Sequence, residues 1–308
     1  MNLADSVDPA AAASSAPVAR KGRGARRAER SGGAGSAFGG PNAWLRTPFI
    51  ERGIPSYDIA TEAQVDRVMA AVDRILAEIG IEFRDDPETV ERFRRAGGHV
   101  TQLTPESWNI KFAPGMIRDL CRTAPARFTQ HARNPANSVR IGGKNVVFSP
   151  AYGSPFVMDL DRGRRFGTLE DFRNFIMLAQ SSPNFHHSGG TICEPTDIAV
   201  NKRHLDMVLA HMELSDRCYM GSVTHQSRAE DNIEMSRILF GADFVEQNCV
   251  ILGNVNVNSP LVWDGTMTKS LRAYARANQA AVIVPFILGG AMGPVTNAGA
   301  IAQSLAET

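Results

Sequence analysis

Three asparagines at alternate positions have the spacing expected of ligand-binding residues on one strand. Asn254, Asn256 and Asn258 are separated by valines and follow the short apolar run 249–252. Side chains two residues apart on an extended chain share a face, so the three amides would line one wall. Polar groups at the carboxyl end of a buried strand indicate a ligand site in an α/β sheet or barrel. A strand that enters an asparagine-rich turn is the competing interpretation.

Small and polar residues also follow three other apolar runs. They occupy the segments 186–190, 221–225 and 285–292, where several glycines would let a ligand approach the backbone. The carboxyl ends of neighbouring parallel strands meet at one mouth of a barrel. Because the carboxyl ends of all four predicted strands carry such residues, we predict that they form one substrate-binding wall. Its expected members are His187, Ser222, Asn254, Asn256, Asn258 and Phe286.

The adjacent histidines His186 and His187 do not predict a metal site. Neighbouring side chains on a strand point to opposite faces, so the two rings cannot easily bind one metal ion. We expect at most one ring to face the site and the other to be a hydrogen-bonded core histidine. Glu194 and Asp197 would attract a cation or start a helix, and Trp263 would face a cation. No Ser-His-Asp arrangement, P-loop or paired-carboxylate spacing stands out, so the catalytic residue stays unassigned.

The elements that must position this wall form a regular array. Predicted strands start near residues 184, 217, 248 and 280, about 32 residues apart, with helices between them. The helix before the first of these strands starts at Thr168, with Asp171 three residues on. Right-handed crossovers give a parallel sheet. Equal units and no GxGxxG after a first strand favour a (β/α)8 TIM-type barrel over a dinucleotide-binding fold.

The barrel is expected to be incomplete in this chain. We count four clear strands, or five with 146–148, whereas closure needs about eight. The chain also stops inside a helix predicted from residue 295 onward. We therefore expect the N-terminal portion of a longer protein, with the C-terminal barrel units missing and a strand edge unpaired.

Three segments divide the chain. Residues 1–43 are rich in Ala, Gly, Ser, Pro and Arg, which predicts a disordered basic tail, either solvated or in contact with an anionic surface. Residues 44–167 are expected to form a helical and β-hairpin cap, and residues 168–308 the first part of a βα barrel. The cap would hold one helix from the capping box of Thr61 and two more within 87–96 and 104–123, the last with Pro105 near its first turn. Hairpins would follow from residue 126 onward.

Bulk composition excludes several classes of protein. The net charge of +1 gives no global field that would select nucleic acid or a membrane as partner. The four cysteines are far apart without CxxC spacing, which indicates reduced thiols in a cytoplasmic protein. No apolar stretch reaches the length of a membrane span, and the N-terminus lacks the apolar core of a secretory signal.

Nine segments of the chain together match a pattern seen in a known family: 75–81, 131–134, 167–172, 187–190, 194–197, 203–207, 220–224, 258–261 and 285–288. They resemble the trimethylamine methyltransferase family, the corrinoid-dependent methylamine and betaine methyltransferases. The resemblance covers residues 44 to 308 and implies a barrel enzyme that moves a methyl group from a methylated amine to the Co(I) of a partner corrinoid protein. The amine would be trimethylamine or a quaternary amine such as glycine betaine.

The resemblance also implies how the reaction is divided between proteins. The corrinoid (cobalamin) would come from the partner protein, with no cofactor or metal bound directly by this chain, in one-carbon metabolism of the methanogenesis type. The family's barrel continues beyond residue 308, where trimethylamine-specific members carry pyrrolysine, so we expect this portion alone to be inactive. The resemblance also allows a homo-oligomer. The alternatives are a non-catalytic module that binds a quaternary amine or a corrinoid protein, and a metal-dependent barrel hydrolase.

Overall fold

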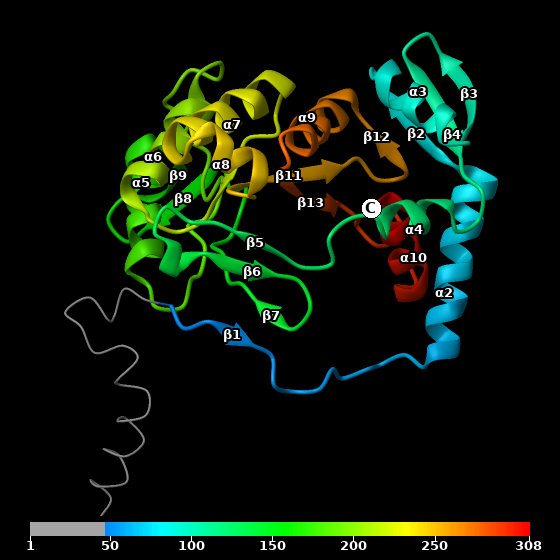
Figure 1. Ribbon diagram of the computed structural model, residues 1–308, viewed down its shortest axis with the longest axis horizontal. Coiled ribbons are helices and arrows are strands. Elements are labelled where there is room, and N and C mark those ends of the chain that lie inside the picture. Colours follow the sequence, from blue (N-terminus) through cyan, green and yellow to red (C-terminus); the bar gives the residue numbers. More distant parts are fainter. Residues whose placement is uncertain (1–46) are drawn as a thin grey trace, which may run out of the picture. The chain divides into compact units, whose positions relative to one another are not determined.

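The computed structural model describes residues 47–308 (Figure 1). The tail predicted for residues 1–43 lies outside the described residues. Within residues 47–308, none of the helices has both the length and the apolar character needed to cross a bilayer.

A parallel sheet forms the centre of the array, as predicted. Strands β10 (Tyr219–Gly221), β11 (Ile251–Val257) and β13 (Ala280–Pro285) pair in the order β10-β11-β13. Gly221 aligns with Gly253, and Gly253 with Ala281. The predicted first strand is reduced to a parallel bridge between His187 and Cys218. In the described residues these strands form an open sheet, so the α/β class is confirmed and a closed barrel stays a prediction.

Helices alternate with these strands. Thr168 caps α5 through a capping box with Asp171, and Asp264 caps α9 by accepting from the Met267 amide, 2.9 Å. Both helix starts follow the sequence signals, because a side-chain oxygen there satisfies an amide that the helix leaves unpaired. The helices are α5 (Leu169–Ser181), α6 (Arg203–Leu214), α7 (Gln226–Phe240), α8 (Ala242–Gln247), α9 (Gly265–Arg276) and α10 (Asn297–Glu307).

The two faces of the sheet differ in burial. Val255 and Val257 of β11 point to the side that carries the main core and are almost fully buried. On the opposite side Asn254 is half-buried and Asn256 is exposed. The predicted alternation of valine and asparagine is therefore confirmed, and it leaves the amides on the uncovered face.

The cap contains the three predicted helices, but the third is shorter than expected. Thr61 forms the predicted capping box with Gln64 and starts α2 (Glu62–Arg74), which continues as a π-helix over Ile75–Ile79. Strand β2 (Ile81–Arg84) and helix α3 (Pro87–Arg95) follow. The start expected near Pro105 was wrong: β3 (His99–Thr104) and β4 (Ser107–Lys111) form a hairpin there, and helix α4 covers only Met116–Cys121.

Strand pairing explains why no helix starts near Pro105. Ser107 and Ile110 are buried, and β4 pairs with both β2 and β3, so cross-strand pairing outweighs the helical signal of Pro105. Pro105 instead lies in the turn between the two strands. Strand β12 (Val262–Trp263) adds to this sheet beside β2, so a segment of the βα array completes a sheet of the cap.

Short strands make up the rest of the segment before residue 168. The hairpins predicted from residue 126 onward are confirmed. Pro135 to Asn137 forms a 3-10 turn between two of these strands. The strands are β5 (Phe128–Gln130) with β6 (Val139–Ile141), β8 (Phe156–Asp159) with β9 (Gly163–Phe166), and β7 (Asn145–Val146) with β1 (Ile50–Glu51).

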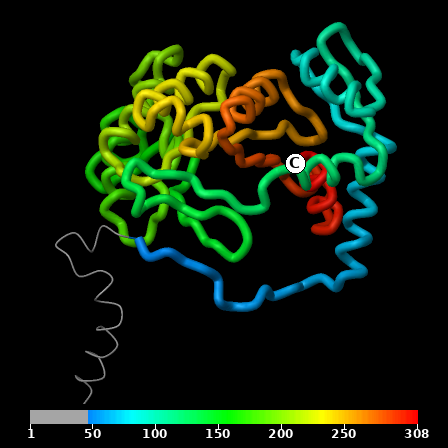
Figure 2. The backbone as a smooth tube through the Cα atoms, viewed as in Figure 1, coloured from blue at the N-terminus to red at the C-terminus, as the bar shows by residue number. Residues whose placement is uncertain are grey.

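One hydrophobic core runs through cap and array. Leu76 and Phe83 of the cap belong to the same buried cluster as Val255 and Tyr274 of the array. Figure 2 shows α2 in blue beside α10 in red, two helices far apart in the sequence that pack together. Burial of apolar area on both sides of this contact stabilises the cap against the array.

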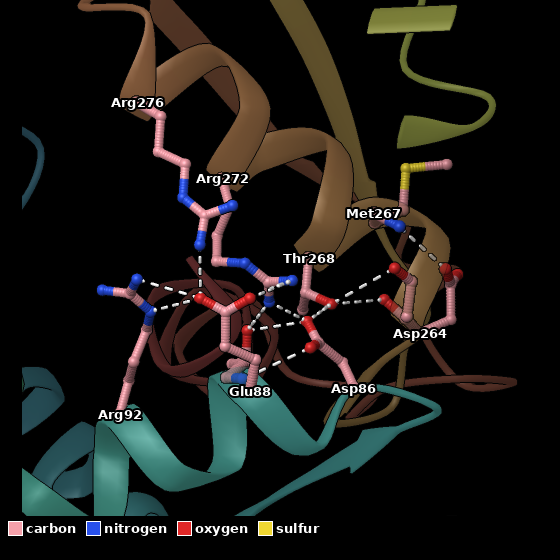
Figure 3. A network of polar contacts seen from close by, with 10 residues as sticks. Asp86, Glu88, Arg92, Asp264, Met267, Thr268, Arg272 and Arg276 are labelled. Carbon is pink, nitrogen blue, oxygen red and sulfur yellow. Dashed lines mark hydrogen bonds and ion pairs between the residues drawn. The ribbon is translucent and has the colours of Figure 1, made fainter. Parts of the chain in front are cut away.

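A buried ionic cluster, which we call the α3–α9 joint, adds a polar link (Figure 3). The Asp86 carboxylate accepts from the Thr89 hydroxyl at 2.7 Å, the Thr268 hydroxyl at 2.6 Å and the guanidinium of Arg272. Glu88 on α3 binds both Arg272 and Arg276 on α9. Burial raises the pKa of Asp86, but the donors from Thr268, Thr89 and Arg272 outweigh it and hold the pKa below its ordinary value.

Candidate functional site

Ser222, Asn254 and Asn256 lie on one surface of the parallel sheet, which we call the open face. The pairing of Gly221 with Gly253 brings Ser222, one residue on, beside Asn254. Asn254 aligns with Val282, and Asn256 with Val284, so these valines belong to the same face. Val282 and Val284 are 43% and 37% exposed. The open face therefore combines amides with uncovered apolar side chains.

The amides of Asn254 and Asn256 are not committed to the fold. Among the described residues neither side chain makes a hydrogen bond, whereas Asn258 donates to the Asp264 carboxylate at 2.7 Å. The Asn258 backbone also pairs with Val262. Asn258 thus closes the loop before α9, and the two other asparagines remain free to bind a ligand.

Phe286 follows directly after β13. It is 62% exposed and continues the alternation of Val282 and Val284 along the chain. Leu288 is exposed at the next alternate position. This row gives the open face an apolar border at the carboxyl end of the strand.

His187 lies apart from the other predicted wall residues. His187 pairs with Cys218, and Cys218 precedes Ser222 by four residues along the chain. The His187 side chain is only 1% exposed. Its Nδ1 accepts from the Gly189 amide at 2.9 Å, so Nε2 carries the proton and donates to Gln130 Oε1 at 3.2 Å. Burial and, to a smaller extent, the nearby His211 lower the pKa of His187 to about 3. His187 is therefore a neutral core histidine beneath the open face.

The other two histidines near this strand are also held by the fold. His186 accepts from the Phe148 amide at 3.0 Å and donates to the Pro48 carbonyl at 3.0 Å. His211 donates from Nε2 to the Gly190 carbonyl at 3.0 Å and accepts the Ser188 hydroxyl at 2.9 Å. Burial lowers the pKa of His211 to about 4. Of His186 and His187, both, rather than one, are hydrogen-bonded within the protein.

A cavity of about 200 Å³ opens between α6 and α7, at the carboxyl ends of the first strand and β10; we call it the α6–α7 cavity. Met220, Gly221 and Ser222, at the carboxyl end of β10, also line it. A side chain at Gly190 would meet the Tyr152 ring at 2.7 Å, so a glycine there lets this aromatic ring pack against the strand end. The polar residues of the lining include Thr191, Glu194, Arg203, His204, Thr224 and Arg228.

The charged groups of this cavity are only partly paired. Arg203 forms an ion pair with Glu194 and donates to the Ile198 carbonyl at 2.9 Å. His204 Nε2 lies 2.8 Å from an Asp231 carboxylate oxygen, while its buried Nδ1 has no hydrogen-bond partner in the described structure. Arg228 donates to the Thr224 hydroxyl at 2.9 Å and makes no ion pair with any residue from 47 to 308.

Arg203, His204 and Arg228 were not among the site residues predicted from the sequence. The available signal was the position of Arg228, three residues beyond the strand end at His225. Glu194, Asp197 and Trp263, which were considered for contacts with a cation, make contacts within the protein. Glu194 binds Arg203, Asp197 accepts from the Leu169 amide at 2.9 Å, and the largely buried Trp263 donates to the Glu307 carbonyl at 3.0 Å.

Metal-binding and thiol chemistry find little support in this part of the chain. No group of three or more His, Cys, Asp or Glu side chains within residues 47–308 is placed to hold a metal ion. Burial raises the pKa of Cys193 and Cys249 to about 11 and that of Cys218 to about 12. These thiols stay protonated near neutral pH and are poor nucleophiles.

Comparison with known proteins agrees with the sequence resemblance. A family model described as "Trimethylamine methyltransferase (MTTB)" matches residues 19–308. A glycine betaine methyltransferase from Desulfitobacterium hafniense (strain Y51) is 43% identical over 255 residues, which cover 82% of this chain and 52% of that protein. The chain thus spans about half the length of this curated relative.

Proposed function

The chain belongs to the trimethylamine methyltransferase family, and from this membership we propose that the full-length protein demethylates glycine betaine. The methyl group would pass to the Co(I) of a corrinoid carried by a partner protein, and dimethylglycine would leave. A relative that is 43% identical and is named for glycine betaine supports this choice over trimethylamine.

The observation that carries the proposal is the pair of uncommitted amides on the open face. Asn254 and Asn256 make no hydrogen bond within the described residues, and Val282 and Val284 flank them. A quaternary ammonium group presents methyl groups and a delocalised positive charge but no N–H donor. Apolar side chains suit its methyl groups, and amide oxygens suit its charge, so this mixed surface fits such a group.

The chemistry asks this chain to orient the substrate rather than to transfer protons. A quaternary ammonium leaves as a neutral amine that keeps the electron pair of the broken N–CH3 bond, so it needs no general acid. The protein must hold one methyl group toward the partner's cobalt and keep the mouth of the sheet open to the corrinoid. Orientation alone supplies a large part of such a rate enhancement.

The architecture proposed for the full-length protein is a closed (β/α)8 barrel. Within residues 47–308 β13 pairs only with β11, and Val282, Val284, Phe286 and Leu288 stay exposed. An unpaired edge with an uncovered apolar face is what further barrel strands would cover. The open face would then line the interior of the barrel, with Phe286 near its mouth.

The test is methyl transfer by the full-length protein with its corrinoid partner reduced to Co(I). We expect glycine betaine to discharge the Co(I) absorbance and to give one dimethylglycine per methyl group transferred. Trimethylamine serves as the competing substrate, and faster turnover of trimethylamine would overturn the substrate assignment. Thermal stabilisation by glycine betaine without any methyl transfer would instead support a non-catalytic binding module.

A further inference from the structure

The α6–α7 cavity carries one positive charge more than its own residues neutralise. Its charged lining consists of Arg203, Arg228, Glu194 and the ionisable His204. Glu194 is bound to Arg203, and His204 to Asp231, so Arg228 is the cation that remains without a carboxylate in the described structure. A buried or half-buried cation is stabilised by an anionic partner, and a planar guanidinium matches a carboxylate in geometry.

His204 is a second and independent sign of a missing partner. The residue is only 6% exposed, and its Nδ1 has no hydrogen-bond partner, although most buried polar atoms have one. The other buried atoms that lack a partner are Nε atoms of arginines whose terminal nitrogens already bind carboxylates. His204 is thus the one ring nitrogen in the described chain that is buried without a partner.

The cavity also reaches the open face. Ser222 belongs to both, and Met220, on the same face of β10, lines the cavity as well. A volume of about 200 Å³ excludes a nucleotide or a drug-sized ligand and suits a group of a few heavy atoms. Ser222 is therefore the residue at which the cavity and the ammonium site proposed for the open face meet.

We propose that the α6–α7 cavity binds the carboxylate of a carboxylate-bearing quaternary amine, with Arg228 as the main contact. The Thr224 hydroxyl, which already binds Arg228, would orient the guanidinium, and His204 would add a polar contact from α6. This inference rests on the proposed function and assigns the part of the site that separates such substrates from trimethylamine, which has no carboxylate.

The test measures KM and kcat for glycine betaine in the full-length protein with its corrinoid partner. Loss of a charge-assisted hydrogen bond should raise KM by about tenfold or more in Arg228→Gln. Arg228→Lys keeps the charge and should give an intermediate KM. His204→Gln, whose amide nitrogen can still donate to Asp231, removes only the free ring nitrogen and should raise KM by a smaller factor.

Arg237→Gln is the matched control, because Arg237 lies on the same helix but pairs with Glu234 outside the cavity. Its KM should stay within about twofold of the natural protein. The inference is overturned if Arg228→Gln leaves KM unchanged, or if Arg237→Gln raises it equally. Should Arg228→Gln fail to fold, the Arg228→Lys and His204→Gln variants decide in the same way. An unmodified protein that does not turn over glycine betaine would instead refute the proposed function itself.

Discussion

The α3–α9 joint and the α6–α7 cavity are both polar and partly buried, but they use their charges in opposite ways. In the joint, Asp86 is 1% exposed and accepts from three different side chains, one of them Arg272 of α9. In the cavity, Arg228 has no carboxylate partner within the described chain, and the buried Nδ1 of His204 has no partner at all.

This difference indicates that the joint stabilises the fold and that the cavity binds a ligand. Buried charges are tolerated only when they are paired and hydrogen-bonded, so a complete cluster such as the joint holds elements together. A cluster that lacks one partner loses stability on its own and gains it when a ligand supplies the partner. The comparison therefore predicts that changes in the joint act on folding, and that changes at the cavity and the open face act on the substrate.

The largest expected effect is that of Asp86→Ala. The substitution leaves the Arg272 guanidinium without its buried partner, and breaking a buried ion pair in this way costs about 3–5 kcal/mol. Urea denaturation of the full-length protein measures the free energy of unfolding. Glu91→Gln on the same helix breaks only exposed pairs and should cost less than about 1 kcal/mol. Equal losses for the two variants would refute a structural role specific to the joint.

The second prediction concerns pH, through His187 and His211. Their folded pKa values, about 3 and about 4, lie below the ordinary value of 6.5 because both rings are buried. The unfolded chain takes up these protons as the pH falls below about 6.5, and the folded chain does not. Their contribution to stability is therefore complete above about pH 6.5 and is lost toward pH 4, by about 1.4 kcal/mol per pH unit for each ring.

His211→Gln tests this assignment. The glutamine amide can still donate to the Gly190 carbonyl, but it takes up no proton. The slope of unfolding free energy against pH, measured between pH 4.5 and 6, should fall by about 1 kcal/mol per pH unit. An unchanged slope would show that His211 is not neutral in the folded protein.

The third prediction concerns the face of the parallel sheet that packs against the helices. Gly253 points toward the helices, and a Cβ there would lie 2.7 Å from the Tyr274 ring, whose hydroxyl donates to the Ser222 carbonyl at 2.9 Å. Gly253→Ala should destabilise the protein by about 1–3 kcal/mol, because a packed core tolerates an added methyl group poorly. Gly53→Ala is the control, since no atom lies within 4 Å of its added methyl group. Comparable unfolding midpoints for both variants would contradict this packing.

Signals within short stretches of sequence predicted most of this architecture. The capping boxes at Thr61 and Thr168 and the regular strand-helix spacing reflect interactions between residues close in sequence. The error at β4 has the opposite origin, because that strand depends on β2, more than 20 residues earlier in the chain. Pairing over such a distance leaves no mark that distinguishes it from a short helix.

The candidate site also contains residues whose positions follow from the sequence and residues whose positions do not. The alternation of Asn254 and Asn256 with valines fixes which side of the strand they occupy, and this follows from the sequence alone. The position of His187 does not, because its burial depends on Gln130, which reaches it from a distant strand. Arg228 was missed for a similar reason: its lack of an ion pair is a property of the folded surroundings, not of its neighbours in sequence.

The smallest expected effect on stability, and the sharpest test of the open face, is that of Asn256→Ala. Its amide makes no hydrogen bond in the described part of the chain, so the free energy of unfolding should change by less than about 0.5 kcal/mol. The rate of methyl transfer from glycine betaine should nevertheless fall by about tenfold if the amide orients the ammonium group. Asn248→Ala, before β11 begins, removes a hydrogen bond to the Phe244 carbonyl and should change stability more than methyl transfer. Unchanged demethylation by Asn256→Ala would remove this residue from the substrate wall.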